Sequence, residues 1–112
     1  MNTITPSHQA PKTFIIILNW NNAPDTIECL ESIFKLKGHG YQVVVCDNAS
    51  TDNSKAKIWD WLVRHNRVVN KINESDLDSI KSPLDAEGVL ISNEKNYGYA
   101  GGNNRGLRYA LA

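Results

Sequence analysis

The stretch FIIILNW, residues Phe14 to Trp20, is a short and almost wholly apolar run that is rich in β-branched side chains. Such a run is typical of a strand that is buried on both faces of a parallel sheet. Two further runs, YQVVVCD from Tyr41 to Asp47 and GVLIS from Gly88 to Ser92, have the same character. Together they predict three strands of one sheet.

Helical patterns separate and follow these runs. The first begins near Asn22 or Asp25, either of which can act as the N-cap, and Pro24 is tolerated in a first helical turn. Its apolar stripe consists of Ile27, Leu30, Ile33, Phe34 and Leu36, and it is expected to end at Gly38 and Gly40. A second helix is predicted by Ile58, Trp61 and Leu62. A third, entered through a glycine-rich turn, is predicted by Leu107, Ala110 and Leu111.

This alternation of strands and helices is typical of a Rossmann-like α/β fold. Right-handed crossovers then build a parallel sheet with helices on its faces. Residues 1–12 are expected to form a flexible leader before one domain over residues 13–112. Within that domain residues 66–87 are polar and irregular, which predicts a long exposed excursion with, at most, a short strand at Val68–Val69.

The charges of the chain balance, with 12 Lys and Arg residues against 12 Asp and Glu residues, so no overall field attracts nucleic acid or an anionic membrane. The apolar run Phe14–Leu18 is too short to span a bilayer, and the N-terminus lacks the pattern of a secretory signal. Cys29 and Cys46 are predicted to be reduced, partly buried thiols, and the three histidines are too scattered to indicate a metal site. These features indicate a cytoplasmic protein.

Each predicted strand ends in small polar residues, which read NWNN, DNAS and SNEKNYGYAGGNN. Because ligands of open parallel sheets bind outside the carboxyl ends of the strands, the three clusters are expected to converge on one functional edge. Each cluster alone is ordinary turn chemistry, but the three together favour a binding cleft.

Asp47, at the end of the second predicted strand, can accept hydrogen bonds from a ribose hydroxyl or a nucleobase N–H. The alternative is that it caps the next helix or an Asx-turn. A dinucleotide site would need a G-x-G-x-x-G loop after the first strand, but NWNNAPDT stands there without a glycine. The G-x-x-x-x-G-K-[ST] pattern of P-loop proteins is absent as well.

The glycines come instead after the third strand. Gly101 and Gly102 can let backbone N–H groups approach a ligand, or allow a positive φ before the helix. Asn103 and Asn104 add amide groups, and the guanidinium of Arg105 suits a phosphate or a base edge. The alternative is an ordinary helix N-terminus with an exposed arginine. Nearby, Tyr97 and Tyr99 are free to stack on a ligand or to pack within the protein.

Taken in order, IIILNWNN, TIECLESI, VVVCDNASTDNS and NEKNYGYAGGNNRGL resemble the N-terminal half of inverting family 2 glycosyltransferases. Among these, the rhamnosyltransferase-type branch of bacterial polysaccharide synthesis is the most similar. The resemblance runs from Phe14 to Ala112, with a poor fit over residues 66–87. It implies the N-terminal part of a GT-A fold that binds a nucleotide-diphosphate sugar, such as a UDP-, GDP- or dTDP-sugar, for transfer to a glycan or lipid-linked acceptor.

The resemblance also implies which residues bind the donor. The end of the first strand lies against the nucleoside through Leu18, Asn19, Trp20 and Asn21. Asp47 hydrogen-bonds the base, while Asn48 and Ser50 shape its turn. The nucleotide side of the cleft is lined by Asn96, Gly102, Asn103 and Arg105. Trp20 stands where the family often has Tyr, which keeps an aromatic ring.

In this family a D-x-D-like motif after the next strand holds Mg²⁺ or Mn²⁺ on the diphosphate, and a further carboxylate acts as general base. Ala112 comes before both, so the resemblance implies a donor-recognition part that carries no catalytic residue or metal ligand and is inactive alone. Asp76 and Asp78 have the D-x-D spacing but stand in the wrong segment and are expected in an exposed loop.

Two other function classes stay open. One is a non-catalytic α/β binding or assembly module, and the other is a nucleotidyltransferase, although its glycine-rich signature after the first strand is absent. In a GT-A fold the next strand pairs beside the first, so FIIILNW is expected to have an open edge, with Leu107 and Leu111 less covered. Both features predict self-association. The expected location is the cytoplasm or the inner face of a membrane.

Overall fold

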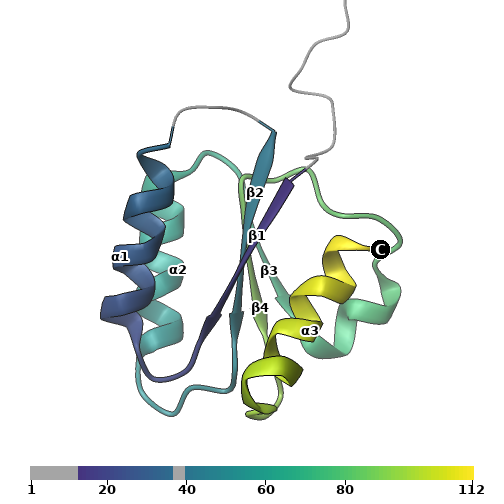
Figure 1. Ribbon diagram of the computed structural model, residues 1–112. Helices are drawn as coiled ribbons and strands as arrows, with labels where there is room; N and C mark the ends of the chain where they lie inside the picture. The colour runs from purple at the N-terminus through teal and green to yellow at the C-terminus, as the bar shows by residue number, and fades with distance from the viewer. Residues whose placement is uncertain (1–12, 37–39) are drawn as a thin grey trace, which may run out of the picture.

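The computed structural model of the protein describes residues 13–36 and 40–112. In chain order its elements are β1 (Thr13–Asn19), α1 (Ala23–Phe34), β2 (Tyr41–Asp47), α2 (Ser54–His65), β3 (Val69–Asn73), the 3₁₀ helix η2 (Glu74–Ser79), β4 (Gly88–Ser92) and α3 (Gly98–Ala110). Figure 1 shows that the strands form one sheet and that the helices lie against it. The predicted leader and Gly38 lie outside the described residues. The predicted α/β class is confirmed.

The four strands form one parallel sheet in the order β1-β2-β4-β3. The register brings the strand ends level: Asn19 lies opposite Asp47, Asp47 opposite Ser92, and Ser92 opposite Asn73. The carboxyl ends of all four strands therefore form one row across the sheet. In open parallel sheets this is the edge at which ligands bind.

β1 is an edge strand and is less completely buried than predicted, although side chains on both of its faces pack against the core. Its residues Phe14–Leu18 are half-buried, whereas Val44 and Val45 of β2 are fully buried. The reason is that β1 pairs with β2 alone among the residues that the structure describes. An apolar, β-branched run predicts a strand but not its position in the sheet.

Helices cover both faces of the sheet, with α1 and α2 on one face and α3 with η2 on the other (Figure 1). The core under α1 and α2 contains Ala23, Leu30, Val43, Val45, Ile58, Trp61, Leu62 and Leu90. The core under α3 and η2 contains Val44, Cys46, Ile72, Leu77, Ala86, Val89, Ile91 and Tyr109. Burial of each large apolar side chain contributes about 1.5–3 kcal/mol.

The first two helices follow the predicted pattern closely. Asn22 is the N-cap residue of α1 and Pro24 stands in its first turn, although the Asn22 side chain makes no capping hydrogen bond. The predicted apolar positions of α2 are buried as expected. The apolar stripe of α1 is shorter than predicted, because Phe34 is 53% exposed and Leu36 lies beyond the end of the helix at 59% exposure.

Residues 66–87 are not the exposed excursion that their polarity predicted. They contain β3, which extends beyond the short strand expected at Val68–Val69, and η2. Ile72, Leu77 and Ala86 are buried against the sheet. Since β3 reads VNKIN and is an edge strand, its polar side chains reach solvent and only Ile72 is deeply buried. That arrangement leaves almost no apolar signal in the sequence.

The glycine-rich segment is helical rather than a turn before a helix, because α3 begins at Gly98. Its buried positions are Gly102, Gly106 and Tyr109, whereas the predicted Leu107 and Leu111 are 47% and 76% exposed. A Cβ on Gly102 would lie 2.5 Å from Leu18 Cδ1, and one on Gly106 would lie 2.7 Å from Cys46 Sγ. Because such contacts are too short to form, these two glycines allow α3 to approach the sheet closely.

Tyr109 fixes the other end of α3. Its hydroxyl donates a hydrogen bond to Gln42 Oε1 at 2.6 Å and accepts one from the Leu84 N–H at 2.8 Å. Gln42 is fully buried, and its Nε2 donates to the carbonyl oxygens of Leu84 and Ala86. This network joins α3, β2 and the segment before β4.

Candidate functional site

The polar clusters after β1, β2 and β4 converge as predicted. The side-chain amide of Asn19 donates to Asp47 Oδ1 at 2.9 Å, and that of Asn93 donates to Asn48 Oδ1 at 3.0 Å. All four residues are at least 95% buried, with exposures of 1% for Asn19, Asp47 and Asn48 and 5% for Asn93. We call this row of carboxyl ends, with the loops that follow it, the carboxyl rim.

The Asp47 carboxylate is engaged within the chain. Oδ1 accepts hydrogen bonds from Asn19 Nδ2 and from the Ser50 hydroxyl at 2.7 Å, and Oδ2 accepts one from the Ser50 N–H at 3.0 Å. This geometry corresponds to the turn-stabilising alternative that the sequence left open. Contact between Asp47 and a nucleobase stays a prediction.

Asn19 and Asn21 join neighbouring loops. Asn19 Oδ1 accepts a 2.6 Å hydrogen bond from the Thr26 hydroxyl in the first turn of α1. Asn21 has a positive φ of 48°, and its Oδ1 accepts hydrogen bonds from the Thr51 and Asp52 N–H groups. The β1–α1 and β2–α2 loops are therefore held together. Trp20, between the two asparagines, is 50% exposed.

Asn48 is the centre of the second cluster, with four hydrogen bonds. Its Nδ2 donates to Asn96 Oδ1 and to the Gly98 carbonyl, both at 3.0 Å. Its Oδ1 accepts from Asn93 Nδ2 and from the Tyr97 N–H. Because a side-chain amide offers two N–H donors and one oxygen with two lone pairs, these contacts use its whole capacity. Asn48 therefore fixes the path from β4 into α3.

Arg105 is neither free nor fully exposed. Its Nε donates to Glu74 Oε2 at 3.2 Å, its Nη1 donates to the Gly101 carbonyl at 3.0 Å, and its Cζ lies 3.6 Å from the centroid of the Tyr97 ring. The Tyr97 hydroxyl donates to both oxygens of Glu74 at 2.8 Å. Tyr97 thus packs within the protein, whereas Tyr99 is 78% exposed.

Glu74 is a member of this cluster that no sequence pattern indicates, since it lies in the segment predicted to be an exposed excursion. Burial alone would raise the pKa of Glu74, but hydrogen bonds from the Glu94 N–H, Tyr97 and Arg105 outweigh it and hold the pKa below its usual value of 4.5. The carboxylate is therefore charged at neutral pH. No local sequence pattern marks Glu74, because its partners stand 20 or more residues further along the chain.

The remaining predicted site residues differ in accessibility. Gly102 is buried against Leu18 and Asn48, so its missing side chain is explained by packing inside the protein. Asn96 is exposed at the rim, and Asn103 is half-buried on α3. Direct contact of any of them with a nucleotide stays a prediction.

The described residues do not fit the divalent metal ion that the resemblance implies. Within residues 13–36 and 40–112, no group of three or more His, Cys, Asp or Glu side chains is placed to hold an ion. Asp76 and Asp78 are exposed on η2, and Asp78 pairs with Arg108.

Both cysteines are free thiols, but only Cys29 is exposed. Burial raises the pKa of the Cys46 thiol to about 12, which makes it unreactive at neutral pH. Cys46 belongs to the core beneath Gly106 rather than to the carboxyl rim.

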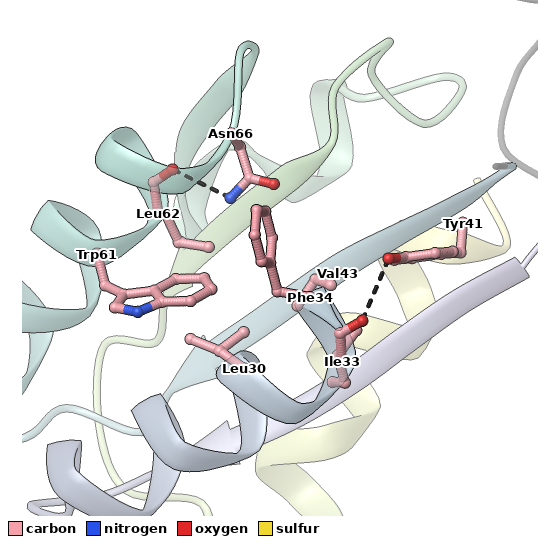
Figure 2. Close-up of a pocket in the computed structure, with 8 residues that line it drawn as sticks. All are labelled: Leu30, Ile33, Phe34, Tyr41, Val43, Trp61, Leu62 and Asn66. Carbon is pink, nitrogen blue, oxygen red and sulfur yellow. Dashed lines mark hydrogen bonds between the residues drawn. The ribbon is translucent and has the colours of Figure 1, made fainter. Parts of the chain in front are cut away.

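A shallow apolar pocket lies elsewhere, near the amino end of β2 (Figure 2). It is lined by Leu30, Ile33, Phe34, Tyr41, Val43, Trp61, Leu62 and Asn66. Its Tyr41 hydroxyl and Asn66 amide donate to the backbone carbonyls of Ile33 and Leu62. The pocket does not overlap the carboxyl rim. None of the helices within residues 13–36 and 40–112 combines the length and the apolar character that a membrane span requires.

Comparison with known proteins gives the family. Searches of curated proteins and of solved structures give no match to this chain. The family model described as glycosyl transferase family 2 matches residues 14–112. The match includes both polar clusters of the carboxyl rim, and the parallel sheet with its flanking helices is consistent with the N-terminal part of a GT-A fold. The chain belongs to glycosyl transferase family 2.

Proposed function

We propose that this chain binds a nucleotide-diphosphate sugar at its carboxyl rim, as the donor-recognition part of a glycosyltransferase. Family membership supports glycosyl transfer in general. The observation that carries the finer proposal is the convergence of the buried Asn19–Asp47 and Asn48–Asn93 pairs at the ends of β1, β2 and β4. A rim whose polar groups are already fixed loses little entropy when a ligand binds.

The proposed contacts fall into two layers. The buried layer of Asn19, Asp47 and Asn48 holds the loops in place. The accessible layer meets the nucleotide, with the half-exposed ring of Trp20 for the base and the amide of Asn96 for polar contacts. The Asp47 carboxylate accepts three hydrogen bonds within the chain, so Oδ2 keeps one acceptor site for a base N–H.

The finer identity of the reaction is also a proposal. We assign the chain to inverting transfer onto an acceptor hydroxyl, in the rhamnosyltransferase-like branch of bacterial polysaccharide synthesis. The donor is a UDP-, GDP- or dTDP-sugar, and the acceptor is a glycan or a lipid-linked glycan at the cytoplasmic side of a membrane. We propose that residues 13–112 alone bind the donor without turning it over.

A thermal-shift screen tests this proposal. The chain is heated with UDP-, GDP- and dTDP-sugars, and with NAD and ATP as unrelated nucleotides. We expect one sugar nucleotide to raise the melting temperature, and Trp20→Ala to abolish that shift. Val63→Ala is the matched control, because Val63 is a similarly exposed apolar residue, at 47%, on α2. No shift with any sugar nucleotide would favour the non-catalytic module instead.

We also propose that the chain self-associates through the side of β1 that pairs with no strand among residues 13–36 and 40–112. β1 has no charged residue or proline to block pairing, and α3 packs beside it with Leu107 and Leu111 exposed. Light scattering behind a sizing column is expected to show dimers or larger species that Leu111→Glu reduces and Val63→Glu does not. A stable monomer at high concentration contradicts this proposal.

A further inference from the structure

We propose that Glu74 is a positioning residue that holds the Arg105 guanidinium ready for the diphosphate of the donor. The inference rests on the proposed function and adds to it a residue from η2. The observation behind it is the cluster of Glu74, Tyr97 and Arg105 beside the ends of β3 and β4.

The position of Glu74 relative to the rim follows from the sheet register. Asn73 is the last residue of β3 and lies level with Ser92, which lies level with Asp47. Glu74 is therefore the first residue beyond the row of strand ends. Tyr97 connects it to the centre of the rim, because its N–H donates to Asn48 and its hydroxyl donates to Glu74.

Arg105 is held from three sides in this cluster. The Glu74 carboxylate and the Gly101 carbonyl each accept one of its N–H groups, and the Tyr97 ring lies against the guanidinium face. The arginine side chain is 23% exposed and that of Glu74 is 13% exposed. An ion pair this sheltered from water has a better defined geometry than one on an open surface.

The guanidinium nevertheless keeps hydrogen-bonding capacity. It has five N–H donors, of which Nε–H and one on Nη1 are used, and no residue in the described chain accepts a hydrogen bond from Nη2. Guanidinium groups bind phosphate oxygens through pairs of N–H donors. The free donors therefore suit an anionic ligand with several oxygens, which is the chemistry of a diphosphate.

Glu74 would improve binding by fixing Arg105 before the ligand arrives. A free arginine side chain loses rotamer entropy when it is immobilised, and a positioned one has lost it already. The alternative is that the cluster only stabilises the fold. The two roles differ in ligand dependence, since a stabilising role affects all ligands alike.

The test compares ligands with and without phosphates. Calorimetric titration measures the Kd of UDP, GDP and dTDP, and ligand-observed NMR competition measures that of the matching nucleosides, for the full chain and for Glu74→Gln, Arg105→Gln and the double variant. The control is Arg108→Gln, which removes another ion pair between α3 and η2. Melting temperatures establish that every variant is folded during the titration.

We expect Arg105→Gln to weaken binding of the nucleoside diphosphate about 10- to 50-fold, and Glu74→Gln to weaken it about 5- to 10-fold. Losses of this size correspond to the removal of charge-assisted hydrogen bonds. Nucleoside affinity should change less than about twofold, and Glu74→Gln should add nothing to Arg105→Gln. Arg108→Gln should leave every Kd unchanged. Normal diphosphate binding by Glu74→Gln, or equal loss for nucleoside and diphosphate, overturns the inference alone. Absence of nucleotide binding by the unaltered chain overturns the proposed function and the inference with it.

Discussion

The two faces of the sheet are built in different ways. On one face, α1 and α2 pack through large side chains such as Leu30, Ile58 and Leu62, each at most 1% exposed. On the other, α3 approaches the strands through Gly102 and Gly106, with Tyr109 as its one large buried side chain. Large apolar side chains hold α1 and α2 against the sheet, whereas α3 packs closely against it because glycines face the strands.

This difference changes the interpretation of the glycine-rich motif. Glycines near a proposed nucleotide site suggest a backbone that cradles phosphate, but Gly102 and Gly106 face Leu18, Asn48, Ile16 and Cys46. They place α3 close to β1 and β2, so that the loop before it lies over Asn48. The two faces should then respond to opposite kinds of mutation.

The largest effect is expected from truncation on the α1/α2 face. Ile58→Ala leaves a cavity at a fully buried position and should lower the free energy of unfolding by about 3–4 kcal/mol. Chemical denaturation measures the loss, with Val63→Ala on the exposed side of α2 as control. A loss below about 1 kcal/mol would mean that this core can collapse around the gap.

Enlargement is the matching test of the α3 face. In Gly106→Val the new side chain meets Cys46 Sγ and Ile16 Cγ2, at 2.7 and 2.8 Å from the Cβ position, and should lower the free energy of unfolding by about 2–3 kcal/mol. Asn104→Val, on the exposed side of the same helix, is the control for the β-branched residue. Equal stability of the two variants would remove the contrast between the faces.

The hydroxyl of Tyr109 should matter less than either packing change. Tyr109→Phe keeps the ring but leaves Gln42 Oε1 and the Leu84 N–H without their partner, which should cost about 1–2 kcal/mol. Denaturant titration of Tyr109→Phe beside Tyr99→Phe separates the buried hydroxyl from an exposed one. An unchanged midpoint for Tyr109→Phe would show that water replaces the lost contacts.

Acid should remove the contribution of Glu74. Its pKa is lowered in the folded state, so the charged form stabilises the fold above pH 4.5, and this contribution disappears as the pH falls through the lowered value. Glu74→Gln should therefore be less stable than the unaltered chain by about 1 kcal/mol at neutral pH and equally stable in strong acid. Denaturation curves of both proteins, measured from neutral pH to strong acid, test whether the stability difference disappears as the pH falls.

The two cysteines are expected to differ in reactivity, and this prediction involves the smallest expected change in stability. Cys29 should react with a thiol reagent in the native protein while Cys46, buried beneath Gly106, reacts only after denaturation. One thiol per chain should be titrated before denaturant and two after it. Rapid labelling of Cys46 in Gly106→Val but not in the unaltered chain would confirm that the glycine closes this face.

The sequence predicts the parts of the fold that carry an apolar signal. The three apolar runs are strands, and Ile58, Trp61 and Leu62 are buried on α2 as expected. On α3 the apolar pattern predicts Leu107 and Leu111, which are exposed as their expected lack of cover implied, and it does not reveal the buried glycines, because glycine carries no apolar signal. Only the start of β3, at Val69, was predicted, for the related reason that an edge strand with polar side chains resembles a loop.

The sequence likewise predicted which residues meet in the candidate site but not the hydrogen bonds between them. The convergence of Asn19, Asp47 and Asn48 follows from strand order and the rule for parallel sheets. Their hydrogen-bond partners do not follow, because an amide can donate or accept in any direction. The role of Glu74 could not be predicted from the sequence, since only the three-dimensional fold brings it into contact with Arg105.

The strand order also constrains how quickly the chain can fold. In the two outer pairs, Thr13 meets Tyr41 and Val69 meets Gly88, whereas the central pair must bring Val43 to Gly88, 45 residues later. Because longer separations fold more slowly, we expect β2 and β4 to pair last, with the inner edges of two half-sheets exposed until then. Pulse-labelled hydrogen exchange should accordingly find the Val43 amide, which donates to the Glu87 carbonyl, protected later than the Glu87 amide, which donates to Val68. The centre of the sheet, its most buried part once formed, would be the last to close and the most prone to aggregation while open.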